Sequence, residues 1–103
     1  MKYVAAVDVG GTSIKAALVS SDFQIIESAS TPTPKGDLSG ELTAHAIAQL
    51  VSQFEEKHPV SGVGLAVPGA LDEPAGVCRW AGNLGWKNIP IVDLVRRATN
   101  RPV

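Results

Sequence analysis

The opening of the chain carries two apolar runs separated by a glycine pair and surrounded by acidic, hydroxyl and lysine side chains. Residues 4–19 read VAAVDVGGTSIKAALV. The first run has the composition of a central strand that is covered on both faces, and it ends on Asp8, a residue type that strands normally avoid. We therefore predict a β-hairpin whose turn contains Gly10 and Gly11 and whose carboxylate has a function.

Two interpretations of this turn are open from the residues alone. Glycine permits positive φ and close approach of a ligand, and successive N–H groups in such a turn form a concavity that binds anions. Thr12, Ser13 and Lys15 would add donors to phosphate oxygens, and Asp8 would face the metal that accompanies a nucleotide. The alternative is an ordinary two-residue hairpin turn in which Asp8 bonds only to the turn's backbone. Neither G-x-G-x-x-G nor G-x-x-x-x-G-K-[ST] is present to decide between them.

Length, charge and cysteine content limit the classes of protein. The 103 residues can form one small domain with a core, and the net charge of −1 gives no electrostatic footprint for nucleic acid or an anionic membrane. No apolar run approaches the ~20 residues of a membrane span, and the apolar start is interrupted at Asp8, unlike a signal peptide. Cys78 has no partner for a disulfide or zinc site, which favours a core residue over a reactive thiol. We expect a cytoplasmic protein without nucleic-acid or membrane partners.

The first two thirds of the chain predict an α/β fold. Residues 23–30 form a third strand of mixed polarity, suited to a sheet edge, and residues 31–36 contain two prolines and a glycine, which predict a connection. Asp37 is the expected N-cap of a helix that runs to about Lys57. Residues 60–67 form a buried strand expected to lie parallel to the first. The apolar stripe of the helix is predicted to consist of Leu42, Ala46, Ile47, Leu50, Val51 and Phe54.

The last third is less regular. Residues 68–72 leave the carboxyl end of a strand, where ligands collect in open sheets, and a short strand at 76–80 precedes a loop at 81–86. Trp80 and Trp86 are suited either to stacking on a sugar or to covering the core, and we favour the core. A second helix opens at residues 88–90, and residues 100–103 begin another strand. The buried stripe of that helix is predicted to be Ile91, Leu94, Val95 and Ala98.

Three segments, in this order, resemble the N-terminal part of a bacterial ROK-family sugar kinase of the glucokinase type. DVGGTSIK at 8–15 is similar to the family's first phosphate motif, and GVGLAVPG at 62–69 is similar to its G-[IV]-G-[IV]-x-x-P-G strand and loop. NLGW at 83–86 is similar to its N-L-x-W segment. The resemblance covers essentially the whole chain.

The resemblance implies a lobe of the actin-like ATPase (ribonuclease H-like) fold, with a mixed sheet that opens with a three-stranded antiparallel meander and with helices packed on the sheet. Residues 1–103 would be the N-terminal of two lobes, and the full-length parent would phosphorylate a hexose with ATP and Mg²⁺. By the same resemblance, the residues expected to contact phosphate are Gly10, Gly11, Thr12, Ser13 and Lys15, and Asp8 is expected to place Mg²⁺ through water. The residues expected to border the sugar are Gly69, Ala70 and, more weakly, Asn83.

The same resemblance places the general base outside this chain. In the family it is the aspartate of an N-D-A motif that follows a strand start like Pro102-Val103, so no residue here is assigned a catalytic role, and Asp8, Asp72 and Asp93 are not substitutes. We therefore expect the chain to be truncated before this motif and to be inactive alone. A zinc cluster and the adenosine pocket would lie in the C-terminal lobe, through which the parent would form homo-oligomers. Which hexose is used, and whether ATP or polyphosphate is the donor, stay open.

Two other classes of protein compete with the kinase. A sugar-responsive transcriptional repressor of the ROK type shares these lobes, but it carries a helix-turn-helix before the phosphate motif, and Met1 lies only seven residues before Asp8. A filament-forming or chaperone-like ATPase would not be expected to combine Pro68-Gly69 with the NLGW segment. The kinase is the favoured function.

Overall fold

The computed structural model describes residues 1–103 as two small sheets and two helices. The first sheet has the strand order β3-β2-β1-β4 and the second has the order β5-β6-β7. The strands of the first sheet are β1 (Tyr3–Val9), β2 (Ser13–Ser20), β3 (Ile25–Pro32) and β4 (Gly62–Ala66). The remaining elements are α1 (Glu41–Glu55), β5 (Ala70–Asp72), β6 (Val77–Ala81), β7 (Trp86–Ile89) and α2 (Ile91–Thr99).

The strand pairing of the first sheet agrees with the predicted topology. β1 pairs with β2 and β2 with β3 in antiparallel fashion, and β1 pairs with β4 in parallel. The third strand, however, begins and ends two residues later than predicted. Thr31 and Pro32 pair with Ile14 and Ser13 instead of forming a connection. Proline is tolerated here because β3 lies at the edge of the sheet, where the missing N–H costs no ladder bond.

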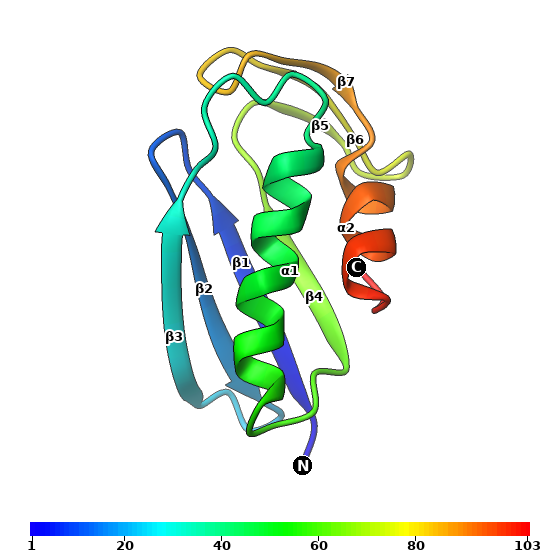
Figure 1. Cartoon of the computed structure of the whole chain (residues 1–103). Helices are drawn as coiled ribbons and strands as arrows, with labels where there is room; N and C mark the ends of the chain where they lie inside the picture. The colour runs from blue at the N-terminus through cyan, green and yellow to red at the C-terminus, as the bar shows by residue number, and fades with distance from the viewer.

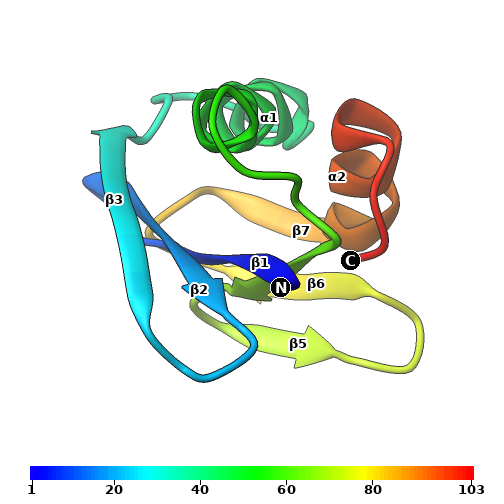
Figure 2. The ribbon, with the colours of Figure 1, turned by 90° about the horizontal axis from the view of Figure 1, so that it is seen from below.

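Helix α1 covers one face of the β1–β4 sheet, and α2 packs beside α1 and on β6, so the opposite face of the sheet carries no helix (Figures 1 and 2). Alternate residues of β1 and β2 are buried on the face that α1 covers: Ala5, Val7, Val9, Ile14, Ala16 and Leu18. The residues between these, including Val4, Ala6, Asp8 and Lys15, are exposed on the opposite face. The prediction of a first strand covered on both faces is therefore wrong for this structure, because the period-two alternation of a strand sends every second side chain to the helix-free side.

The start of α1 differs from the prediction. Its N-cap is Gly40, and Asp37, which is buried, reaches the helix from the preceding connection. The two carboxylate oxygens of Asp37 accept hydrogen bonds from the N–H of Leu42 (3.2 Å) and from the N–H and hydroxyl of Thr43 (2.8 Å each). Because the helix is fixed at this register, Thr43 is buried while Leu42, predicted to be in the apolar stripe, is 57% exposed.

We expect Asp37→Ala to lower the free energy of unfolding by about 2 kcal/mol, since three donors at the helix start lose their acceptor. Urea denaturation followed by tryptophan fluorescence measures this change. Ser39→Ala is the matched control, because Ser39 accepts only one exposed bond from Glu41. Equal unfolding midpoints for the two variants would contradict the capping role.

The second sheet corrects the prediction for the last third of the chain. Residues 70–72 and 86–89 are strands, although both were expected in loops or a helix start. Trp86 is 2% exposed and its indole N–H donates to the Asp37 carbonyl (2.8 Å), whereas Trp80 is 62% exposed. Core burial is thus confirmed for Trp86 and wrong for Trp80. In α2, Ile91 and Val95 are buried as predicted, but Ala98 is exposed. Neither helix is long and apolar enough to cross a membrane.

Candidate functional site

Three loops meet at one end of the molecule: the β1–β2 turn, the β3–α1 connection and the β6–β7 turn (Figure 1). The first of these, residues 10–12, is called the glycine turn below. Within it the Gly10 N–H donates to the Ser13 carbonyl (2.9 Å). Thr33 donates its hydroxyl to the Gly10 carbonyl (2.7 Å) and its N–H to the Thr12 carbonyl (3.0 Å).

These bonds leave two donors of the glycine turn without a partner in the chain. The backbone N–H groups of Gly11 and Thr12 make no hydrogen bond to protein atoms, and both residues are exposed. Consecutive unpaired N–H groups in a turn are suited to an anion with several acceptor oxygens, such as a phosphate.

Glycine is required in this turn for a different reason from the one predicted. Neither Gly10 nor Gly11 has a positive φ. A Cβ on Gly10 would instead lie 2.8 Å from the Ser13 carbonyl oxygen, and a Cβ on Gly11 would lie 3.0 Å from the Asn83 side-chain nitrogen. The turn therefore depends on close packing, with backbone at the first glycine and with a side chain at the second.

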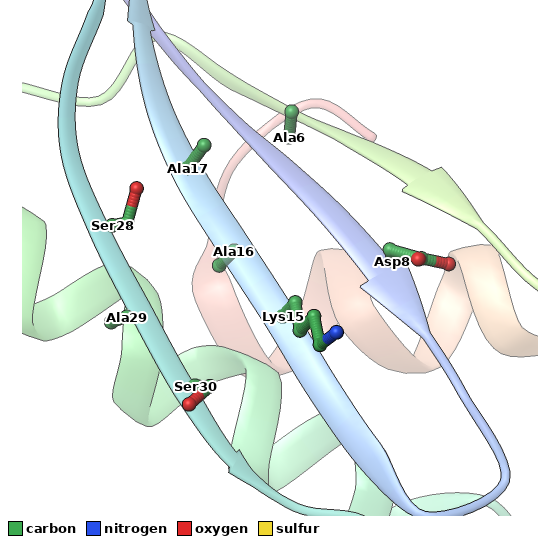
Figure 3. A pocket seen from close by; sticks show the side chains of 8 residues that line it. All are labelled: Ala6, Asp8, Lys15, Ala16, Ala17, Ser28, Ala29 and Ser30. Carbon is green, nitrogen blue, oxygen red and sulfur yellow. The ribbon is translucent and has the colours of Figure 1, made fainter.

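Asp8 and Lys15 flank the glycine turn on the helix-free face of the sheet. They are directly opposite each other in the β1–β2 register, both are exposed, and they line one pocket of about 510 Å³. Figure 3 shows the two side chains near the turn, with alanines and serines lining the rest of the pocket. The ion pairs of the structure involve other residues, so both charges are available to a ligand.

The residues expected to border the sugar lie at the same end of the molecule as the glycine turn. Gly69 has φ +94° and packs so tightly on β6 that a Cβ would lie 2.1 Å from the Trp80 carbonyl oxygen, while Ala70 pairs with Trp80. Asn83, at the tip of the β6–β7 turn, packs on Gly11. The fold thus brings the expected phosphate and sugar segments together, although Gly69 already has a structural reason to be glycine.

Other titratable groups are engaged elsewhere. Asp72 is bonded to Arg79 (2.9 Å), and this hydrogen bond, with a weaker one from the Ala75 N–H, lowers the pKa of its carboxyl. Asp93 pairs with Arg97 on the surface of α2. Burial raises the pKa of the Cys78 thiol, which fits a core residue. No three His, Cys, Asp or Glu side chains are grouped as a metal cluster.

Sequence reasoning missed one residue of this site. Thr33 lies between two prolines in a segment whose composition predicts a connection, yet it is 5% exposed and donates hydrogen bonds to two carbonyls of the glycine turn. Nothing in the local pattern indicates a contact across 23 residues of chain. Only the pairing of β3 with β2 brings the two segments together.

Comparison with known proteins identifies the fold and the family of this chain. The fold is that of an actin-like ATPase lobe, and it superposes on a ROK-family glucokinase from Streptomyces griseus, solved in complex with glucose and AMPPNP, with a TM-score of 0.88 and 30% identity. That match covers 98% of this chain and 31% of the other. The ROK family model matches residues 4–103, and the chain belongs to the ROK family.

The curated relatives include glucokinases and a repressor. A glucokinase of Halalkalibacterium halodurans is 33% identical over 107 residues, which are 99% of this chain and 32% of the relative. A xylose repressor of Caldicellulosiruptor bescii is 36% identical over 44 residues, 43% of this chain and 11% of the repressor. The chain thus spans about a third of the length of the glucokinases it matches.

Proposed function

We propose that this chain is the N-terminal lobe of an ATP-dependent hexose kinase and that glucose is its first candidate substrate. The observation that carries the proposal is the glycine turn, with two unpaired N–H groups, in a hairpin whose strands also carry the unpaired charges of Asp8 and Lys15. The curated relatives that match nearly the whole chain are sugar kinases, while the curated repressor matches less than half of it, so the repressor is the weaker alternative.

The donor set of this lobe fits Mg²⁺ and ATP. The N–H groups of Gly11 and Thr12 would bind phosphate oxygens, with the hydroxyls of Thr12 and Ser13 beside them. Lys15 would offset negative charge on the phosphates, and Asp8 would hold the hydration shell of Mg²⁺. When bound, Mg²⁺ neutralises charge on the transferring phosphoryl group.

On the sugar side, Gly69, Ala70 and Asn83 would border the hexose. No carboxylate here is assigned as the general base, because Asp8 belongs to the phosphate side and Asp72 and Asp93 are paired with arginines. The Val63 N–H donates to the Pro102 carbonyl (2.8 Å), so the terminal residues run beside β4. In the whole kinase, we expect the general base to lie on a strand that continues along this edge of the sheet. We expect the whole kinase to be a cytoplasmic homo-oligomer.

Titration of the ¹⁵N-labelled chain with ATP and Mg²⁺ tests the phosphate half of the proposal. We expect weak binding, with amide shifts concentrated at Gly11, Thr12 and Ser13. Shifts spread over the surface, or none at millimolar ATP, would contradict it.

The whole kinase tests the other half. A coding sequence that continues after Val103 should contain Asn-Asp within about ten residues, and the purified product should phosphorylate glucose or a related hexose with ATP. The 103-residue chain itself should show no turnover. A continuation without Asn-Asp, or turnover by the isolated chain, would overturn this assignment.

A further inference from the structure

Thr33 is the one buried polar residue that contacts the glycine turn and has no role in the proposed chemistry. It is 5% exposed and follows directly after β3, the edge strand of its sheet. Its hydroxyl and its N–H hold the carbonyls of Gly10 and Thr12, at 2.7 and 3.0 Å. One residue therefore fixes both ends of the turn.

Holding a carbonyl also fixes the direction of the next N–H. A peptide unit is planar and trans, so its C=O and N–H point to opposite sides. With the Gly10 carbonyl held toward Thr33, the Gly11 N–H must point away from Thr33. The same relation joins the Thr12 carbonyl to the Ser13 N–H. The hydrogen bond from Thr33 to the Gly10 carbonyl therefore sets the direction of the Gly11 N–H, because both groups belong to the same peptide unit.

Thr33 is itself held in a stiff segment. Pro34 disfavours the helical region for the residue before it, so Thr33 is restricted to extended conformations, and Pro32 has a fixed φ. The segment pairs with β2 up to Pro32, opposite Ser13. The Thr-Pro repeat that reads as a break in the sequence thus supplies a rigid support for the turn.

We propose that Thr33 is a positioning residue that orients the Gly11 N–H for phosphate binding. The inference rests on the proposed function, because both require that the glycine turn binds phosphate. Its specific claim is that the Thr33 hydroxyl, and not merely the packing of its side chain, determines the affinity. Without that hydroxyl the Gly10–Gly11 peptide is free to rotate, and the donor is no longer preorganised.

The test compares Thr33→Val, which keeps the shape and removes the hydroxyl, with Thr33→Ser, which keeps the hydroxyl. Inorganic tripolyphosphate with Mg²⁺ is titrated into each ¹⁵N-labelled chain, and Kd is taken from the Gly11 and Thr12 amide shifts. We expect Thr33→Val to raise Kd about tenfold and Thr33→Ser to stay within about twofold of the wild type. Thr31→Val, on the same strand, is the control and should bind like the wild type.

A second readout needs no ligand. In the free chain, Thr33→Val should shift the Gly10 carbonyl ¹³C resonance and lower the order parameter of the Gly11 amide, while Thr33→Ser should do neither. Thr33→Ala serves the same comparison where the valine variant is unfolded.

The outcomes separate the two claims. Wild-type affinity and an unchanged Gly11 order parameter in Thr33→Val would overturn the positioning role. Equal losses in the valine and serine variants would also overturn it, because they would indicate packing alone. Failure of the wild type to bind tripolyphosphate would count against the proposed function, and the ligand-free readout would still decide the role of Thr33.

Discussion

Replacing Gly69 by alanine is expected to lower the free energy of unfolding by about 3–5 kcal/mol, a large part of the total for a small domain. Gly69 has φ +94°, which strains any residue with a Cβ. That Cβ would also lie 2.1 Å from the Trp80 carbonyl oxygen and 3.0 Å from the Ala81 Cα. Both atoms are backbone of β6, which is paired with strands on its two sides and cannot easily move.

Gly64→Ala is the matched control, since Gly64 belongs to the same motif but a Cβ there meets nothing within 4 Å. We expect it to leave stability unchanged or raise it slightly, because alanine costs less backbone entropy than glycine in a strand. Urea unfolding followed by the fluorescence of buried Trp86 measures both variants. A Gly69→Ala variant as stable as Gly64→Ala would show that the packing at β6 is not as described.

The second large effect is expected from Gly10→Ala. A Cβ on Gly10 lies 2.8 Å from the Ser13 carbonyl oxygen, so the turn must open and lose the Gly10–Ser13 bond. We expect about 1–2 kcal/mol of lost stability and about tenfold weaker binding of ATP and Mg²⁺. Urea unfolding and amide-shift titration measure the two quantities.

Gly11→Ala is the control within the same turn. Its Cβ would approach only the side chain of Asn83, at 3.0 Å, and that side chain can rotate away. We therefore expect a smaller loss of stability than for Gly10→Ala. The reverse order would contradict the close-packing explanation of this glycine pair.

Much of the fold follows from local patterns. The meander and the parallel strand near residues 62–66 were predicted from short runs of strand-forming residues bounded by turn residues, and the buried face of α1 from the helical spacing of its apolar side chains. Strands β5 and β7 were missed because they are three and four residues long, too short for a period to show. Helix starts were misplaced because Asp37 caps α1 from outside the helix and Pro90 immediately precedes α2.

The sequence predicted which residues form the candidate site, but it did not predict how these residues are arranged in space. Asp8, the glycine turn and Lys15 are adjacent in sequence, so their grouping follows from one hairpin. The approach of Asn83 to Gly11 spans most of the chain and depends on how the β5–β7 sheet packs. The role of Thr33 likewise depends on the pairing of an edge strand.

The sequence by itself determined the family, the α/β class and the presence of a glycine turn with an acid, hydroxyls and a lysine around it, because these are properties of residue order. Only the tertiary structure decided why Gly10, Gly11 and Gly69 are glycine and which donors stay free for a ligand. The Gly11 and Gly69 contacts and the Thr33 bonds join segments that are separate in sequence, and the Gly10 contact with the Ser13 carbonyl depends on the conformation of the turn itself. A hydrogen bond or a close contact of that kind produces no periodic pattern of residues in the sequence, so it can be identified only once the pairing of the strands is known.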